Sequence, residues 1–290
     1  MRGTPFFAAA LLASASPLAA EVPMAIAASG HATVPVAIDG VGTFDFVLDT
    51  GASESALYDP FVAEHDIPVG ESEDQLVGQT GAVTVRIAAL PRVTMDGHSA
   101  EGIMAAILDA RPDGVPLPGI IGLDLFGDAV LDFDLPRGRA AILESGTVPE
   151  GMEEAESVAA APTLGELLTI PVHIGDVEAL AVIDTGARKT RINWRLGHLI
   201  GLDPSTLDAG ETIQGATNMP VESLEARIAD VRFGDVTLAE APVLVADLPV
   251  FEAFGVADRP AIIFGMDWLE AVRMVIDFPE RRVRFAVTGR

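Results

Sequence analysis

The sequence contains one unit twice, and this repeat constrains the fold more than any other feature. Residues 34–57 read VPVAIDGVGTFDFVLDTGASESAL, and residues 169–192 read TIPVHIGDVEALAVIDTGARKTRI. Each copy has an apolar alternating run, a turn that contains glycine, and a second apolar run that ends in Asp-Thr-Gly-Ala. This pattern is typical of a β-hairpin whose second strand leads directly into a tight turn. Because repeated sequence implies repeated structure, we expect two similar halves.

Two further landmarks follow each hairpin in the same order. One is a glycine-tipped hairpin, formed in the two halves by Gly78, Gln79, Thr80 and Gly81 and by Gly215, Ala216 and Thr217. The other is an apolar-apolar-Gly segment, found at 120–122 and 263–265, which is followed by a short strand that ends in Asp-Phe. Short helices are predicted only near 60–65, 125–129, 194–200 and 268–272. The chain is therefore predicted to be mostly β, in two similar lobes.

Composition divides the chain into segments. The predicted first lobe is 29–143, the segment 144–166 is an acidic linker rich in Glu, Ala, Pro and Gly, and the second lobe is 167–290. Residues 1–20 have the layout of a secretory signal peptide, and no later apolar segment is long enough to span a membrane. Because the chain has no cysteine and so no disulfides, the expected destination is a bacterial periplasm.

Charge and composition exclude several classes of function. With 18 basic and 43 acidic residues the net charge is −25, which repels nucleic acid. The absence of cysteine excludes thiol nucleophiles and Cys-ligated metal centres. The five histidines have no metal-ligand spacing, so we expect no metal and no cofactor. A lysine-based mechanism would depend on Lys189 alone.

Asp49 and Asp184 begin the two Asp-Thr-Gly-Ala motifs. One Asp-Thr-Gly by itself more often makes an ordinary turn. Two copies at equivalent places in a duplicated unit would be related by a pseudo-twofold axis. That symmetry would bring Asp49 and Asp184 together where the lobes meet.

With these paired motifs, each followed by an apolar-apolar-Gly segment, the chain resembles the retropepsin-like aspartyl proteases of bacteria that fuse both halves in one chain. The resemblance covers about 33–143 and 168–285. It implies an all-β fold of two closed, six-stranded β-barrel lobes, or half-barrel lobes, related by pseudo-twofold symmetry with a substrate cleft between them. It also implies that Asp49 and Asp184 are the catalytic aspartates and that the two glycine-tipped hairpins are flaps. The residues that would support the aspartates are Thr50, Gly51, Thr185 and Gly186. The alternative for each hairpin is an ordinary surface turn.

The implied activity is that of an aspartic endopeptidase. Two adjacent carboxylates cannot both ionise, so they share a proton; this enzyme class is the standard illustration of the effect. The ionised member activates a water and its protonated partner polarises the scissile carbonyl. The expected partner is a peptide or protein, and the expected state is a monomer, because one chain already holds both halves. The alternative is a catalytically inactive bilobal protein that binds a peptide or partner in the same cleft.

Several positions depart from the family pattern. Ala52 and Ala187 replace the hydroxyl residue that follows the motif in pepsins, which predicts a higher pKa for the dyad and a less acidic working range. Three cations, Arg188, Lys189 and Arg191, follow the second motif, and one that pointed inward could hold both aspartates ionised.

Six other residues near the motifs are expected to take no part in catalysis. Leu123 and Met266 occupy the position where retroviral proteases have an arginine that ties their dimer, a link that a fused chain does not need. Asp124 and Asp267 are expected to bond local backbone. Tyr58 and Trp194, which follow the two motifs, are expected to be core or pocket-wall aromatics.

Overall fold

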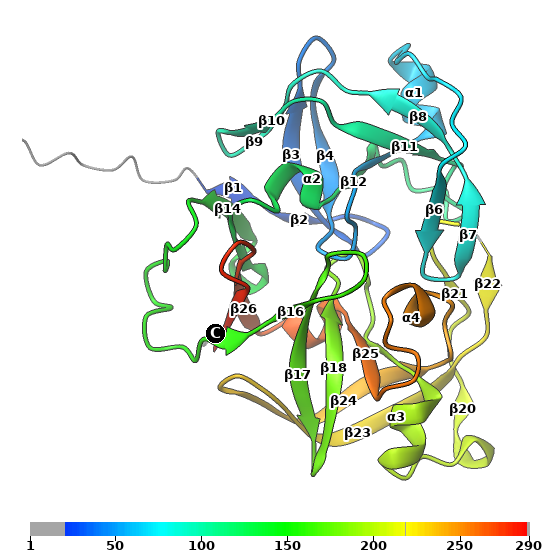
Figure 1. The fold of residues 1–290 in the computed structure, drawn as a ribbon, viewed down its shortest axis with the longest axis vertical. Coiled ribbons are helices and arrows are strands. Elements are labelled where there is room, and N and C mark those ends of the chain that lie inside the picture. The colour runs from blue at the N-terminus through cyan, green and yellow to red at the C-terminus, as the bar shows by residue number, and fades with distance from the viewer. Residues whose placement is uncertain (1–20, 218, 289–290) are drawn as a thin grey trace, which may run out of the picture.

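A computed structural model describes residues 21–217 and 219–288. The predicted signal peptide lies outside these described residues. Two β lobes stand one above the other in Figure 1 and meet across the middle of the molecule. The predicted all-β, two-lobe fold is confirmed. In the part of the chain described, no helix is long and apolar enough to cross a membrane.

The first lobe is built on a curled sheet that begins with the repeated hairpin. Its turn contains Gly40, whose φ of 77° is accessible to glycine at little cost. The nine strands are β2 (Ala25–Ile26), β3 (Ala32–Ile38), β4 (Gly42–Leu48), β5 (Ala56–Tyr58), β8 (Arg86–Ala89), β9 (Val93–Met95), β10 (His98–Ala100), β11 (Met104–Leu108) and β12 (Gly119–Ile121).

The second lobe repeats this arrangement in one eight-stranded sheet. Its strands are β16 (Ala161–Pro162), β17 (Leu168–Ile174), β18 (Val177–Ile183), β19 (Arg191–Ile192), β20 (Asp208–Ala209), β23 (Leu224–Phe233), β24 (Val236–Val245) and β25 (Ala261–Phe264). The long strand β23 pairs with β24 and also with β17, and this second pairing closes a six-stranded barrel.

The two lobes differ in how completely they close. The first lobe has the short strands β8 and β9 where the second has β23, and the interruption contains Pro91, which has no N–H to donate to a ladder. The first lobe is therefore a curled half-barrel, and only the second matches the predicted closed barrel.

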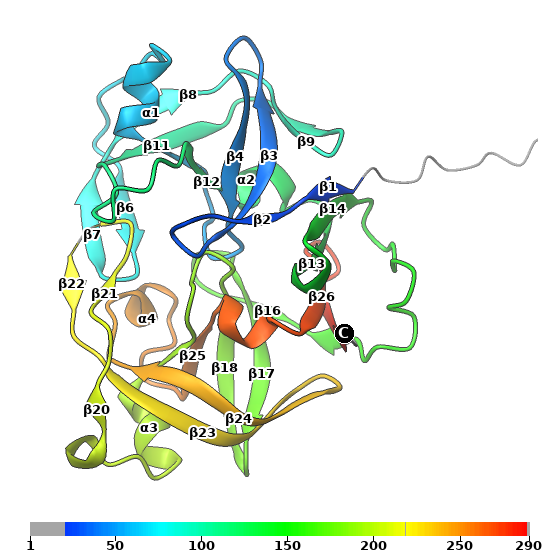
Figure 2. The same cartoon turned by 180° about the vertical axis from the view of Figure 1, so that it is seen from behind.

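A third sheet joins the lobes. It consists of β1 (Val22–Pro23), β14 (Arg139–Leu143), β13 (Val130–Asp134), β26 (Val272–Asp277), β27 (Arg282–Val287) and β15 (Val158–Ala159), in that order. Strand β13 of the first half pairs with β26 of the second, so that Phe133 lies opposite Met274. Figure 2 shows this sheet at the side of the molecule, beside the junction of the lobes.

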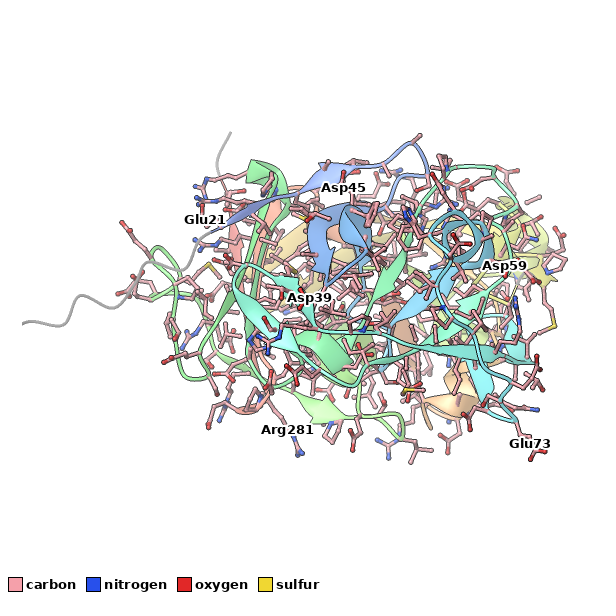
Figure 3. The ribbon with its side chains drawn as sticks, turned by 90° about the horizontal axis from the view of Figure 1, so that it is seen from above. Glu21, Asp39, Asp45, Asp59, Glu73 and Arg281 are labelled. Carbon is pink, nitrogen blue, oxygen red and sulfur yellow. The ribbon has the colours of Figure 1, made fainter. Side chains whose placement is uncertain are left out.

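The predicted linker 144–166 contains strands β15 and β16, which pair with β27 and β17. The predicted domain boundaries themselves stay a prediction. Acidic side chains are spread over the described surface of the molecule. Figure 3 labels five of them: Glu21, Asp39, Asp45, Asp59 and Glu73.

The remaining elements are two hairpins and short helices. The hairpins are β6 (Gln75–Gly78) with β7 (Gly81–Thr84), and β21 (Ile213–Gln214) with β22 (Pro220–Val221). The helices are α1 (Asp59–Glu64), α2 (Leu123–Phe126), α3 (Trp194–Leu199) and α4 (Val250–Ala253), with 3₁₀ turns at Leu135–Arg137, Pro204–Thr206 and Met266–Leu269. The helix predicted at 268–272 is thus wrong, because β26 already begins at Val272; α4 was not predicted.

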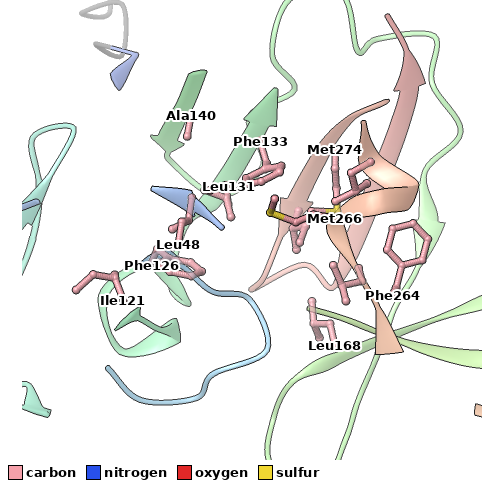
Figure 4. Packing of buried hydrophobic residues seen from close by; sticks show 14 of the residues in the cluster. Leu48, Ile121, Phe126, Leu131, Phe133, Ala140, Leu168, Phe264, Met266 and Met274 are labelled. Atoms are coloured by element: carbon pink, nitrogen blue, oxygen red, sulfur yellow. The ribbon is translucent and has the colours of Figure 1, made fainter. Parts of the chain in front are cut away.

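One hydrophobic cluster runs through both lobes. In Figure 4, Leu48, Phe126 and Phe133 of the first half pack toward Phe264 and Met274 of the second. Since interiors are close-packed and resist deformation, the two lobes are held as one body. The ends of β4 and β18 therefore meet at a defined boundary.

Candidate active site

The two Asp-Thr-Gly loops emerge at this boundary in the same way. Asp49 follows β4, and its N–H donates to the Ile121 carbonyl at 3.0 Å. Asp184 follows β18, and its N–H donates to the Phe264 carbonyl at 3.0 Å. In each lobe the acceptor lies in the apolar-apolar-Gly segment, which runs parallel to the aspartate's strand. The structure thus places the apolar-apolar-Gly segment of each half beside the strand that leads into Asp-Thr-Gly.

The two threonines bond across the lobes. The Thr50 N–H donates to Thr185 Oγ1 at 3.0 Å, and the Thr185 N–H donates to Thr50 Oγ1 at 3.1 Å. Each hydroxyl then donates to the opposite lobe, Thr50 to the Ile183 carbonyl at 2.9 Å and Thr185 to the Leu48 carbonyl at 2.6 Å. Both side chains are buried. Four hydrogen bonds therefore fix the relative position of the loops.

Replacing Thr50 by valine is expected to lower the free energy of unfolding by about 1–3 kcal/mol, because the buried Thr185 N–H loses its acceptor and the Ile183 carbonyl its donor. Thr50→Ser keeps the hydroxyl and is the matched control, with a smaller expected loss. Urea unfolding of the three proteins measures both effects. Equal stability of the valine and serine variants would contradict this role.

The glycines that follow allow the loops to approach closely. A Cβ at Gly51 would lie 2.4 Å from Asp184 Cγ, and one at Gly186 would lie 2.1 Å from Asp49 Oδ2. No side chain fits at either place, so each glycine is required by the carboxylate of the opposite lobe. The Gly51 N–H also donates to Asp49 Oδ1 at 2.7 Å.

The carboxyl groups of Asp49 and Asp184 each lie against the glycine of the opposite motif, and each affects the protonation of the other. Asp184 is buried, with 3% of its surface exposed to solvent, whereas the solvent exposure of Asp49 is intermediate. Burial raises the pKa of both groups, and the charge of Asp184 raises that of Asp49 further. Arg191 opposes the rise in the pKa of Asp184. The charge of Arg191 and the hydrogen bond that Gln79 donates both favour the ionised form of Asp184.

The first predicted flap lies over this pair. At the tip of the β6–β7 hairpin, Gln79 Nε2 donates to Asp184 Oδ2 at 2.7 Å. The Gln79 carbonyl accepts from the Val250 N–H at 3.4 Å, so helix α4 supports the tip from the second lobe. Gly81 has a φ of 153°, and a Cβ there would lie 2.0 Å from Met219 Cε.

The second predicted flap meets the first. Thr80 Oγ1 and Thr217 Oγ1 are 3.0 Å apart, and the Gly215 N–H donates to Thr80 Oγ1 at 3.4 Å. A Cβ at Gly78 would lie 3.0 Å from Thr217 Cγ2, which shows how closely the tips pack. Ala216 packs against the first-lobe cluster that contains Tyr58. The predicted flap residues are therefore gathered in one layer above the aspartates.

The cations after the second motif point in different directions. Arg188 and Lys189 face Glu211, at 3.7 and 3.1 Å, and both are partly exposed. Arg191 is buried, with 6% exposure, and acts on Asp184. Its charge lowers the pKa of Asp184, but burial is the larger cause, and the pKa of each aspartate is raised above its usual value.

Asp124 and Asp267 bond local groups, as expected. Asp124 accepts from the Ser55 N–H and hydroxyl at 2.8 and 2.6 Å. Asp267 accepts from the Thr190 N–H and hydroxyl at 2.9 and 2.7 Å. The two hydroxyls in turn accept from the glycine N–H of each apolar-apolar-Gly segment. These aspartates therefore brace the loops from behind and do not reach the dyad.

Two features of the site had no decisive sequence signal. Gln79 was assigned to a flap, but its bond to Asp184 depends on how the hairpin folds over the second lobe. Arg191 was one of three candidate cations, and alternation along a two-residue strand could not tell that it alone turns inward. Among the described residues, no group of three or more His, Asp or Glu could hold a metal ion.

Comparison with known proteins agrees with this geometry. A family model described as Aspartyl protease matches residues 34–125 and 170–268. Each match begins in the repeated hairpin and extends through the apolar-apolar-Gly segment. A comparison with curated proteins finds no match.

Proposed function

The chain belongs to the aspartyl protease family, and from this premise we propose that it is an endopeptidase that hydrolyses peptide bonds with Asp49, Asp184 and one water molecule. The observation that carries the proposal is the pair of carboxyl groups that meet where the lobes join, held in place by the mutual bonds of Thr50 and Thr185. Such a pair can supply one acid and one base at the same moment.

The proposed reaction follows from the two protonation states. The Asp184 carboxylate takes a proton from the water, whose oxygen attacks the scissile carbonyl carbon. Asp49 donates its proton to the carbonyl oxygen, which gives a neutral tetrahedral diol. Collapse breaks the C–N bond while Asp184 returns a proton to the leaving nitrogen and Asp49 recovers one from the diol. No covalent enzyme intermediate forms.

The flaps supply the proposed binding mode. Peptide in extended form can pair with the backbone of β6–β7 and β21–β22, while its alternate side chains enter pockets on either side. Because Gln79 bonds Asp184 in the closed arrangement, the substrate must displace this side chain to reach the dyad. The hairpin tips, joined to each other mainly by threonine and glycine contacts, are the elements that would open.

The test is cleavage of a peptide library by the full purified chain, analysed by mass spectrometry. In H₂¹⁸O, one ¹⁸O atom is expected in each new carboxyl group after a single turnover, because water attacks directly. Absence of cleavage over a wide pH range would contradict the proposal.

The Gln79 contact also favours a second candidate, a catalytically inactive protein that binds peptides in the same cleft. In that case the side chain would block the dyad permanently. Gln79→Ala separates the candidates. In a working protease the wild type cleaves peptides, and the variant should mainly change KM. In an inactive protein the wild type cleaves nothing, and the variant gains activity only if Gln79 alone blocks the dyad.

We expect a pH optimum well above that of pepsin. Activity requires Asp184 ionised and Asp49 protonated, and the pKa of both is raised. The acid limb of the profile therefore lies above the usual aspartate range, and the raised pKa of Asp49 preserves activity toward neutral pH. The profile of kcat/KM against pH measures this, and an optimum near about pH 2 would contradict it.

The proposal also covers the cellular compartment and the oligomeric state of the protein. The apolar run in residues 1–20 supports export, and the absence of cysteine supports a bacterial periplasm as the destination. Since both Asp-Thr-Gly loops come from one chain, the working form is proposed to be a monomer. Sedimentation of the active protein tests this state.

A further inference from the structure

The two sides of the dyad are chemically different, although symmetry relates them. Ala56 lies seven residues after Asp49, and Arg191 lies seven after Asp184. Ala56 pairs with Ala106 and Ile120, and Arg191 pairs with the equivalent residues Leu244 and Ile263. The same position beside the dyad therefore holds a methyl group in the first lobe and a guanidinium in the second.

Both positions lie beneath a flap. Directly paired residues in a sheet project to the same face, so Arg191 shares a face with Leu244 and Ile263. Those two belong to the cluster that includes Ile213 and packs against Val221, from the second hairpin. On the other side, Ala56 belongs to the cluster that packs against Leu76 and Val83 of the first hairpin. A peptide held under the flaps would meet both surfaces.

Arg191 has unused binding capacity. Its side chain is 6% exposed, and one terminal nitrogen donates to the Lys189 carbonyl at 3.1 Å. Its Nε has no hydrogen-bond partner and is one of only two such buried side-chain atoms in the part of the chain described. Asp267, the nearby structural carboxylate, bonds Thr190 instead. An unpaired buried donor is costly, so such a site is suited to an incoming acceptor.

The surroundings of Arg191 favour an anion. Arg188 and Lys189 share the single carboxylate of Glu211, which shows that these cations accept a carboxylate at this place. At the same end of the cleft, burial and the charges of Arg111 and Arg188 lower the pKa of His31 to about 4. The first-lobe cation Arg111 is already paired with Asp113. Among the described residues Arg191 forms no salt bridge, although the carboxyl groups of Asp184, Glu211 and Asp267 act on it from further away.

We propose that Arg191, with Arg188 and Lys189 at the entrance, forms a subsite for the carboxylate of an Asp or Glu side chain in the substrate. The inference rests on the proposed function and specifies its substrate class. Because Ala56 and Arg191 lie on opposite sides of the dyad, the preference concerns one side of the cleaved bond only. The other side takes an apolar residue against Ala56 and Tyr58. The forked guanidinium binds a carboxylate better than an amide.

The test uses pairs of peptides that differ only by Glu or Gln at the position that the library identifies. For the wild type we expect kcat/KM to be about tenfold or more higher for the Glu peptide, the ratio expected for one charge-assisted contact. Arg191→Met should bring the ratio close to one. Glu211→Gln removes the competing carboxylate at a partly exposed site and should raise the ratio. Each ratio is measured at one pH, so that changes in the dyad's own ionisation cancel.

Arg195→Met is the matched control, because it removes one positive charge from an exposed position of the same lobe and should leave the ratio unchanged. The subsite is overturned if the wild-type ratio is near one, or if neither Arg191→Met nor Glu211→Gln alters the ratio. In either case, cleavage of the peptides still supports the protease. If the wild type cleaves nothing, the same labelled peptides are tested for binding by fluorescence anisotropy. A Glu preference that Arg191→Met removes would then support the subsite without catalysis, and no preference would overturn it.

Discussion

Replacing Asp49 or Asp184 by asparagine is expected to lower kcat for peptide cleavage by about 10³-fold, within the range of general acid–base catalysis. Asparagine has nearly the same shape but neither accepts the proton of the water nor gives one to the carbonyl oxygen. Since the carboxyls act as one pair, the double variant should be hardly less active than either single variant. Initial rates with the best library peptide measure all three.

Stability distinguishes this loss from misfolding. The pKa of both aspartates is raised in the folded protein, so the folded state binds more protons than the unfolded state above the ordinary aspartate pKa. Ionisation of the pair therefore destabilises the fold, and stability from this source falls as pH rises. Asp49→Asn should consequently have a melting temperature at pH 7 equal to or above that of the wild type. Asp45→Asn, at an exposed site, is the control that should retain activity.

Replacing Asp132 by alanine is expected to lower the free energy of unfolding by about 3 kcal/mol, because it removes the directly bonded carboxylate of a buried arginine and leaves only the more distant Asp134 and the Glu150 carbonyl. Arg273 Nε donates to Asp132 Oδ1 at 2.8 Å, and both side chains are 8% exposed. The pair joins β13 of the first lobe to β26 of the second. Weaker docking of the lobes should also lower activity, because each lobe supplies one aspartate.

Two variants make this test specific. Asp59→Ala breaks the exposed pair between Asp59 and Arg86, whose side chains are 50% and 46% exposed, and should cost less than about 1 kcal/mol. The double variant Asp132→Leu with Arg273→Met removes both charges and should recover much of the stability. Guanidinium unfolding of the four proteins gives the comparison; similar losses for Asp132→Ala and Asp59→Ala would contradict the role of the buried pair.

The repeat in the sequence was enough to predict the main architecture. Alternation in 34–48 and 169–183 predicted β3–β4 and β17–β18, and the matching Asp-Thr-Gly motifs predicted that Asp49 and Asp184 would meet. The reason is local: strand periodicity and glycine turns are properties of short segments. Neighbouring strands decide whether a lobe closes, so the sequence left closed barrels and half-barrels open, and the first lobe is interrupted near Pro91. The helix predicted at 268–272 was wrong, because a 3₁₀ turn occupies Met266–Leu269.

The two-lobe β fold, the two motif aspartates and the exclusion of thiol chemistry could all be predicted from the amino-acid sequence. The burial of Arg191, its effect on the pKa of Asp184 and the bond from Gln79 to Asp184 became visible in the folded chain. The contact between Gln79 and Asp184 joins residues more than 100 positions apart, and the burial of Arg191 depends on the strands that pack around it. The burial and the pKa of a side chain depend on all the residues that pack around it. The repeat could therefore predict the symmetry of the site, but not that the charge of Arg191 makes its two halves different.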